Sequence, residues 1–179
     1  MRIISGTYKG KRLMAPAKLP VRPTTDFAKE SLFNILNNYY YFDEISVLDL
    51  FAGTGNISFE FASRGSTDIT CVDSHIGCIK YIQKIATELS LNLKVVKSDV
   101  FKYLENAALA KDVIFADPPY NFELAEFEKI SKLVFEKSLL TENGTLIIEH
   151  SKHTDLSHLP YFYMKKRYGS SVFSFFEKK

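Results

Sequence analysis

The chain has 179 residues, of which 46% are apolar and 25% are charged, and these proportions exclude an intrinsically disordered chain. Charged residues interrupt every apolar run before it reaches membrane-spanning length, and the first ten residues contain no apolar block long enough for a signal peptide. The two cysteines, Cys71 and Cys78, exclude a disulfide framework and fit a reducing compartment. We therefore expect one cytoplasmic domain, a monomer, with a sizeable core.

The charge is distributed unevenly along the chain. Residues 1–30 hold seven Lys and Arg against two acidic residues, and residues 151–179 hold six against two, although the net charge of the chain is only +2. Basic ends that flank an acidic middle are typical of a protein that contacts a phosphate-rich partner. The predicted phosphate contacts in the first segment are Arg2, Lys9, Lys11, Arg12 and Arg22.

The first 25 residues are expected to form an extended arm or β-hairpin, because glycines and prolines break their short apolar pieces. Asp26 is the expected N-cap of a helix, since apolar residues recur at helical spacing from Phe27 to Tyr39. From residue 45 onward, strands and helices alternate. Strands are predicted at 45–51, 68–73, 93–99, 112–117 and 144–150, helices at 56–65, 75–90, 100–109 and 123–140, and two last strands around 169–171.

This alternation predicts an α/β fold with a doubly wound, mostly parallel seven-stranded sheet of the Rossmann-like type. The last two strands would add an antiparallel hairpin at one edge, and the first residues a β-hairpin arm. In such sheets the ligand binds beyond the carboxyl ends of the strands. Acidic residues fall at or just after the ends of four predicted strands: Asp49, Asp73, Asp99 and Asp117.

The first turn of the sheet, "DLFAGTGNIS", has the composition of a cofactor-binding loop. Gly53 and Gly55 would let the backbone approach a ligand, and Asp73, 20 residues after Gly53, could accept hydrogen bonds from a ribose. A dinucleotide site would have a third glycine where this chain has Ser58, and Asp49 would repel a pyrophosphate. S-adenosylmethionine, which carries an ammonium and no phosphate, is therefore the favoured cofactor. A nicotinamide or flavin cofactor remains an alternative. Asp99 could accept from the adenine amino group.

The predicted fourth strand runs directly into Asp117-Pro118-Pro119-Tyr120. The prolines can neither donate to a sheet ladder nor continue a helix, so they fix a rigid loop at the mouth of the cofactor cleft. The Asp117 carboxylate and the Pro118 carbonyl could then grip the two hydrogens of a planar amine. That grip would stabilise the positive charge that develops when the amine attacks a sulfonium methyl group, while Tyr120 stacks on an unstacked base.

Three stretches, "LDLFAGTGNIS", "VDS" and "ADPPY", resemble the motifs of class I amino methyltransferases. The segments "RIISGTYKGKRL" and "RPTTDFAKESLFNIL" narrow the resemblance to the bacterial 16S rRNA (guanine-N2) methyltransferase family, over nearly the whole chain. The resemblance implies S-adenosylmethionine-dependent methylation of a guanine N2 amine in 16S rRNA, within a 30S subunit or an assembly intermediate. It divides the chain into a basic RNA-contacting arm, 1–25, and a methyltransferase domain, 26–179. One departure, Asn56-Ile57-Ser58 in place of a small residue and a glycine, is expected to affect only helix packing.

The predicted site residues fall into three groups, and no metal is expected. The catalytic group is Asp117, Pro118, Pro119 and Tyr120. The cofactor group is Asp49, Phe51, Ala52, Gly53, Thr54, Gly55, Asp73, Ser74, Asp99 and Val100. The RNA-contacting group adds Thr24 and Thr25, which the resemblance places near the catalytic loop, to the five basic residues named above. The alternatives are an adenine-N6 DNA methyltransferase, a protein glutamine-N5 methyltransferase, and a non-catalytic RNA-binding module of the same fold.

Overall fold

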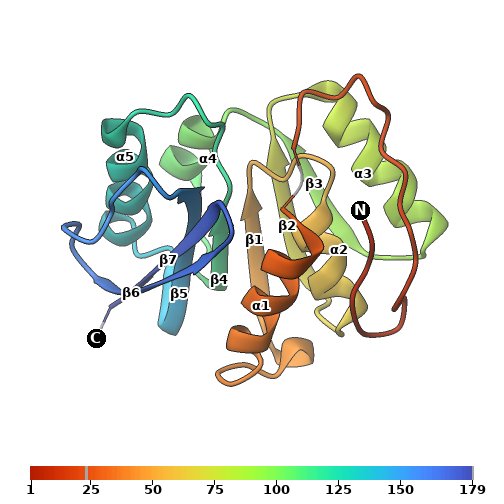
Figure 1. The fold of residues 1–179 in the computed structure, drawn as a ribbon, viewed down its shortest axis with the longest axis horizontal. Coiled ribbons are helices and arrows are strands. Elements are labelled where there is room, and N and C mark those ends of the chain that lie inside the picture. The colour runs from red at the N-terminus through yellow and green to blue at the C-terminus, as the bar shows by residue number, and fades with distance from the viewer. Residues whose placement is uncertain (23, 179) are drawn as a thin grey trace.

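The structure, a computed structural model, describes residues 1–22 and 24–178; Pro23, which falls in the predicted RNA-contacting segment, and Lys179 lie outside the described residues. A single sheet of seven strands has the order β3-β2-β1-β4-β5-β7-β6 (Figure 1). The pairings among β1 to β5 are parallel, and β7 pairs antiparallel with both β5 and β6, which confirms the predicted sheet. The strands are β1 (Ser46–Leu50), β2 (Asp68–Asp73), β3 (Leu93–Lys97), β4 (Lys111–Ala116), β5 (Leu140–Ser151), β6 (Phe162–Tyr168) and β7 (Ser171–Glu177).

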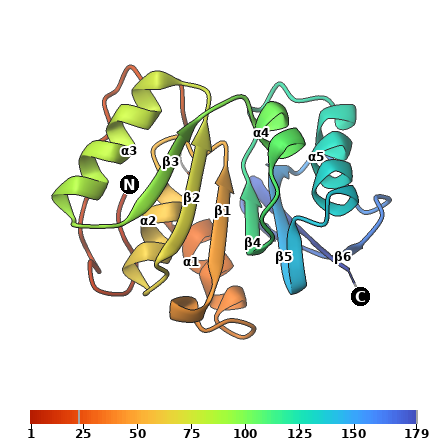
Figure 2. The same ribbon diagram turned by 180° about the vertical axis from the view of Figure 1, so that it is seen from behind.

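Helices cover both faces of the sheet. One face carries α1, α2 and α3, and the other carries α4 and α5 (Figures 1 and 2). The helices are α1 (Asp26–Leu36), α2 (Asn56–Ser63), α3 (Ile76–Glu88), α4 (Val100–Asn106) and α5 (Leu124–Glu136), with a short 3-10 helix at Phe42–Glu44. Each face has its own buried apolar cluster, since alternate residues of the central strands point to opposite faces.

From residue 26 onward the predicted helices and strands are all present, but several boundaries differ. The N-cap of α1 is Thr25 and not Asp26: the Thr25 side chain accepts a hydrogen bond from the Ala28 amide, and Asp26 is the first helical residue. A hydroxyl one residue earlier satisfies the free amides of the first turn equally well, so the sequence pattern alone did not separate the two. None of the helices within residues 1–22 and 24–178 is long and apolar enough to cross a membrane.

The predicted N-terminal β-hairpin is present in reduced form: the Ile3 amide donates to the Lys11 carbonyl and the Leu13 amide to the Met1 carbonyl, at 2.9 and 3.0 Å, without regular strands in this segment. Residues 1–13 fold back on themselves, but only one antiparallel bridge forms, between Arg2 and Arg12. The loop does not project as an arm, because its backbone binds α2: the Thr7 amide donates to the Ser63 carbonyl, 2.7 Å away. Gly6 lies so close to α2 that a Cβ there would fall 1.8 Å from the same carbonyl oxygen. The loop is therefore part of the packed domain.

Candidate active site

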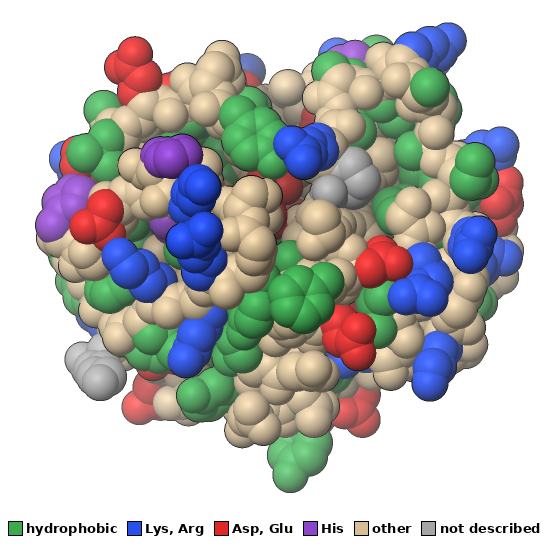
Figure 3. Space-filling model, viewed as in Figure 1, with side chains coloured by type: hydrophobic (Ala, Val, Ile, Leu, Met, Phe, Trp, Pro, Cys, Tyr) green, Lys and Arg blue, Asp and Glu red, His purple; other side chains and the backbone are tan. Residues whose placement is uncertain are grey.

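A cavity of about 710 Å³ opens at the carboxyl ends of the parallel strands. Its walls come from the turns after β1, β2, β3 and β4 and from the segment that precedes α1. Figure 3 views the face with α1 and shows a central hollow with Lys and Arg side chains on both sides of it. The predicted site residues that line the cavity are Arg22, Thr24, Asp49, Phe51, Ala52, Gly53, Thr54, Asp73, Ser74, Asp99, Val100, Asp117, Pro118, Pro119 and Tyr120.

The turn after β1 has an unusual backbone. Phe51, Gly53 and Gly55 all have positive φ, of 60°, 57° and 75°. Phe51 is the informative one, because a bulky residue in this region is strained and such strain concentrates at ligand sites. Its ring packs edge-on against Phe122, which follows the Asp117 loop, at a centroid distance of 5.3 Å. The first turn and the fourth turn of the sheet are therefore packed together at the cavity.

Gly55 does not line the cavity but shapes its base as the N-cap of α2. A Cβ there would meet the Phe59 ring at 2.8 Å and Ile82 at 3.1 Å, in addition to the strain of positive φ. We expect Gly55→Ala to lower the free energy of unfolding by about 2–4 kcal/mol, measured by urea denaturation. The matched control is Gly10→Ala, where φ is 82° but no atom lies within 4 Å; its expected loss is about 1 kcal/mol. Equal losses would contradict the packing argument.

Asp73 organises the turn from the next strand. One carboxylate oxygen accepts from the Gly53 amide and the other from the His75 amide, both at 2.8 Å. These contacts hold the glycine turn against the end of β2. Asp99, after β3, is exposed and accepts from the Lys102 amide at 3.0 Å, so its side chain also caps α4.

Asp49 lies inside β1 and is buried. Its carboxyl accepts a 2.6 Å hydrogen bond from the Ser58 hydroxyl on α2. Burial raises the pKa of Asp49 to about 7, although the bond from Ser58 opposes the shift. Ser58 is thus more than the helix-packing substitution that the sequence suggested, because it is the polar partner of a predicted cofactor ligand. A cation placed beside Asp49 would favour its ionised form.

The Asp117 loop closes the other side of the cavity. The Asp117 amide donates to the Leu50 carbonyl of β1 at 3.4 Å, so the ladder continues one residue past β4. Burial, followed by the nearby Glu149 and Asp49, raises the pKa of Asp117 well above its ordinary value. Tyr120 is 73% exposed, and the Arg22 guanidinium lies 6.0 Å from the centre of its ring. An aromatic face and a cation therefore stand together at the mouth.

The predicted RNA-contacting residues do not form one cluster. Arg22 and Thr24 line the cavity, whereas Arg2 is half exposed and paired with Asp26 at 3.2 Å. Thr24 is buried and its hydroxyl donates to Glu149 at 2.6 Å, while Thr25 caps α1. RNA contact by these residues stays a prediction, and both threonine side chains already have partners within the fold. The remaining predicted contacts are exposed: Lys9, Lys11 and Arg12.

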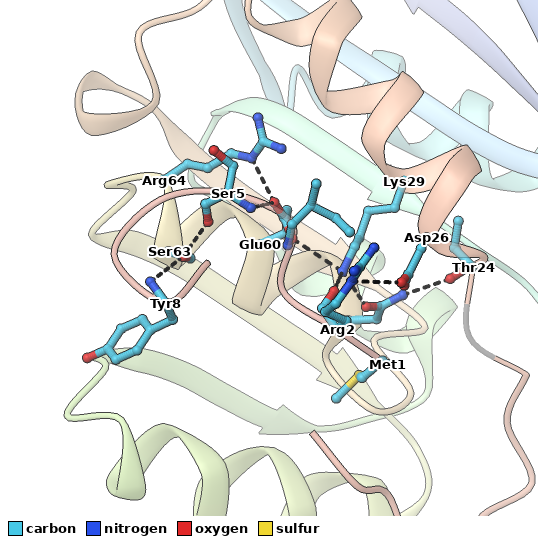
Figure 4. Close-up of polar contacts among 12 residues, drawn as sticks. Met1, Arg2, Ser5, Tyr8, Thr24, Asp26, Lys29, Glu60, Ser63 and Arg64 are labelled. Carbon is cyan, nitrogen blue, oxygen red and sulfur yellow. Dashed lines mark hydrogen bonds and ion pairs between the residues drawn. The ribbon is translucent and has the colours of Figure 1, made fainter. Parts of the chain in front are cut away.

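Sequence reasoning missed a buried polar cluster behind the cavity. Lys29 is 1% exposed, and its ammonium donates to the Arg2 carbonyl and to Asn56 at 2.6 and 2.8 Å. The same ammonium forms an ion pair with Glu60, 3.2 Å away, and the Glu60 side chain has no exposed surface (Figure 4). Burial lowers the pKa of Lys29, and Glu60 opposes the shift. Asn56 connects this cluster to the cavity wall, because its side-chain amide donates a hydrogen bond to the Thr24 carbonyl at 3.0 Å.

Comparison with known proteins places the chain in a family. The model of the family described as Conserved hypothetical protein 95 matches residues 1–177. The chain belongs to this family. The ribosomal RNA small subunit methyltransferase D of Haemophilus influenzae is 33% identical over 168 residues, which cover 87% of this chain and 81% of that protein. The family and the methyltransferase class expected from the sequence are thus confirmed.

Solved structures agree with this membership of the Conserved hypothetical protein 95 family. A hypothetical protein of Thermus thermophilus has a TM-score of 0.85 and 25% identity, and the match covers 99% of each chain. A Thermus thermophilus 16S rRNA N2 methyltransferase, in complex with AdoMet and guanosine, has a TM-score of 0.70 at 19% identity; the match covers 90% of this chain and 45% of that one. The second likeness shows the fold, which is the class I methyltransferase fold.

Proposed function

We propose that this family member transfers a methyl group from S-adenosylmethionine to the exocyclic N2 amine of a guanine in 16S rRNA. The observation that carries the proposal is the single cavity that joins the glycine turn and Asp73 to the Asp117-Pro118-Pro119-Tyr120 loop. Support for the substrate comes from the relative in Haemophilus influenzae, which is named a ribosomal RNA small subunit methyltransferase. The site is proposed to work in the bacterial cytoplasm on a 30S subunit or its precursor, with the protein as a monomer.

The polar groups that line the cavity match the polar groups of S-adenosylmethionine. Asp49 is a buried carboxyl without a cationic partner among the ion pairs of the described residues, which suits an ammonium. Asp73 and Ser74 would face the ribose hydroxyls, and Asp99 the adenine amine. When bound, S-adenosylmethionine supplies a methyl group on a sulfonium, ready for in-line displacement. The part of the protein is then to hold donor and acceptor in line and to exclude water.

The Asp117 carboxylate and the Pro118 carbonyl are proposed to accept hydrogen bonds from the two N–H groups of the guanine amine. Because the lone pair of that amine is delocalised into the base, acceptors on its hydrogens favour the geometry in which nitrogen attacks and stabilise its growing positive charge. Pro119 keeps the loop rigid, since it fixes its own φ and restricts the residue before it. Tyr120, exposed at the mouth, would stack on the extruded base.

RNA phosphates would meet the cations around the mouth. Arg22 is placed best, because it lies over the Tyr120 ring and lines the cavity. Lys9, Lys11 and Arg12 are exposed on the N-terminal loop and would contact phosphates farther from the target base. Arg2 would have to leave Asp26 to do so.

The decisive experiment is transfer of a tritiated methyl group from labelled S-adenosylmethionine to 30S particles isolated from cells that lack the protein. We expect label in 16S rRNA, and N2-methylguanosine when the RNA is digested and analysed by mass spectrometry. Free 16S rRNA, plasmid DNA and a release factor serve as competing acceptors. Label found only in DNA or in protein would overturn the proposed substrate and favour one of the rival enzymes. RNA binding without any transfer would favour a non-catalytic module.

A further inference from the structure

Three carboxyl groups lie on one face of the sheet, at the ends of adjacent strands. In the register, Asp49 pairs with Phe115 and Phe115 with Ile147. Two residues further on, Asp117, just after β4, therefore stands beside Glu149, which lies inside β5 near its carboxyl end. Because side chains alternate between faces, all three acids share the face of Val47 and Phe115, which α1 and α2 cover. Neighbouring parallel strands are about 4.8 Å apart, so the two side chains are neighbours on this face, and Glu149 contributes to the raised pKa of Asp117.

Glu149 is fixed from the side of the cavity wall. The Thr24 hydroxyl donates to its carboxyl at 2.6 Å, and both residues are buried. Thr24 is itself held through its carbonyl by Asn56, which Lys29 orients in turn. Figure 4 shows Thr24 at the end of this chain of contacts, which begins at Glu60 and Arg64. A threonine from the wall segment thus reaches across to the strand next to Asp117.

The charged groups that shift the pKa of Asp117 are acidic, and the cation of the same cavity, Arg22, lies over Tyr120. Asp49 faces the pair of carboxyls from β1, Thr24 and Ser171 offer hydroxyls, and no ion pair among the described residues involves any of the three acids. Lys29, on α1, is already bound to Glu60. Burial raises the pKa of Glu149, while the bonds from the two hydroxyls oppose the shift. Glu149 is buried and Asp117 is partly buried. Two desolvated carboxyls side by side without a cationic partner cannot both ionise easily, and such pairs hold one proton between them.

We propose that Glu149 is a positioning residue for methyl transfer: held by Thr24, it shares one proton with Asp117 and so fixes the orientation of Asp117 toward the substrate amine. The inference rests on the proposed function and adds to it a residue that does not line the cavity. With the proton between the two acids, the free oxygen of Asp117 faces the cavity as an acceptor. Below the pH at which the pair gains its second proton, Asp117 loses its negative charge and transfer slows.

The first test is the pH dependence of kcat with 30S particles, compared between the wild type and Glu149→Gln. Glutamine keeps the shape, can still accept from Thr24 and can donate to Asp117, but it carries no charge. Glutamine therefore stands in for the protonated glutamate of the pair, so we expect the acidic limb to stay in place. The fall in kcat at higher pH, where the wild type loses the shared proton, should disappear in the variant, with KM for both substrates unchanged. A fall in kcat at the same higher pH in both proteins, or no such fall in the wild type, would overturn the inference.

A second pair of variants tests the anchor. Thr24→Val removes the donor to Glu149 at nearly constant volume, and Thr24→Ser retains it. We expect kcat to fall about tenfold in Thr24→Val, with KM unchanged, and to recover in Thr24→Ser. Equal kcat in the two variants, both folded by circular dichroism, would show that the anchor does not position Asp117.

A third measurement does not depend on activity. Carbon-13 NMR of labelled Asp and Glu carboxyls in the free protein should show Asp117 and Glu149 titrating in two coupled steps. In Glu149→Gln, Asp117 should titrate in a single step near the lower of the two, and the upper step should be absent. Independent single steps in the wild type would end the shared-proton proposal even if methyl transfer is confirmed. Conversely, coupled steps in a protein that transfers no methyl group would leave the pair intact and refute the proposed function.

Discussion

Asp117→Ala is expected to lower kcat for methyl transfer by about 10²–10³-fold, the usual loss when one group that stabilises developing charge is removed. The variant deletes the carboxyl that faces the cavity next to the Pro118 carbonyl. It also removes one member of a pair of desolvated carboxyls that has no cationic partner, so the fold should not lose stability. The measurement is single-turnover transfer of tritiated methyl to 30S particles, with cofactor affinity followed by calorimetry.

The Asp117→Asn variant separates two parts of this role. Asparagine keeps an acceptor oxygen in the same place but has no negative charge, so we expect a smaller loss, of about tenfold. Asp43→Ala, on the short 3-10 helix outside the cavity lining, is the control and should leave kcat unchanged. If Asp117→Ala transfers methyl at nearly the wild-type rate, Asp117 does not hold the amine.

Glu60→Leu is expected to lower the free energy of unfolding by about 3–5 kcal/mol, because it leaves the ammonium of Lys29 buried without its opposite charge. The Glu60 carboxylate also accepts from the amides of Ile4 and Ser5 at 2.9 and 3.1 Å, and from Arg64. Leucine satisfies none of these donors, so their desolvation adds to the loss. Urea denaturation followed by circular dichroism measures the change.

Two companion variants make the expectation specific. Glu60→Gln keeps the volume and one acceptor for the backbone amides, so its loss should be clearly smaller than that of leucine. Glu88→Leu breaks the exposed pair with Lys84, whose atoms are 3.8 Å apart, and should change the unfolding free energy by less than about 0.5 kcal/mol. Similar losses for Glu60→Leu and Glu88→Leu would mean that the buried cluster adds nothing to stability.

The sheet could be predicted from the sequence because its signals are local. "DITCVD" is a continuous apolar run bounded by charged residues, and it forms β2 with the predicted limits. The ligand edge followed from topology, since acids at the ends of parallel strands must meet at one edge. This reasoning brought Asp49, Asp73 and the Asp117 loop to one cavity, as the structure has them.

The rest of the site depends on contacts between residues far apart in the sequence. Glu60 and Lys29 look like ordinary polar positions of amphipathic helices, and nothing near them indicates that each is buried by the other. Glu149 follows the apolar residues of its strand, where a charged residue is common and does not indicate a buried site. Its partner Thr24 is 125 residues away in the sequence. The N-terminal loop was predicted as a β-hairpin because its glycines mark turns, and its backbone does fold back on itself; what the sequence did not indicate is that the loop also binds α2.

The attachment of the N-terminal loop to α2 has a consequence for synthesis on the ribosome. The amides of Ile4 and Ser5 find their acceptor 56 and 55 residues later in the chain. The loop is therefore synthesised before α2, and the amides of Ile4 and Ser5 stay hydrated until Glu60 has been made and α2 has formed. We expect a nascent chain stalled before α2 to be cut readily by protease within its first thirteen residues, and one stalled well beyond it to resist. The N-terminal loop would thus become ordered only after α2 has been made.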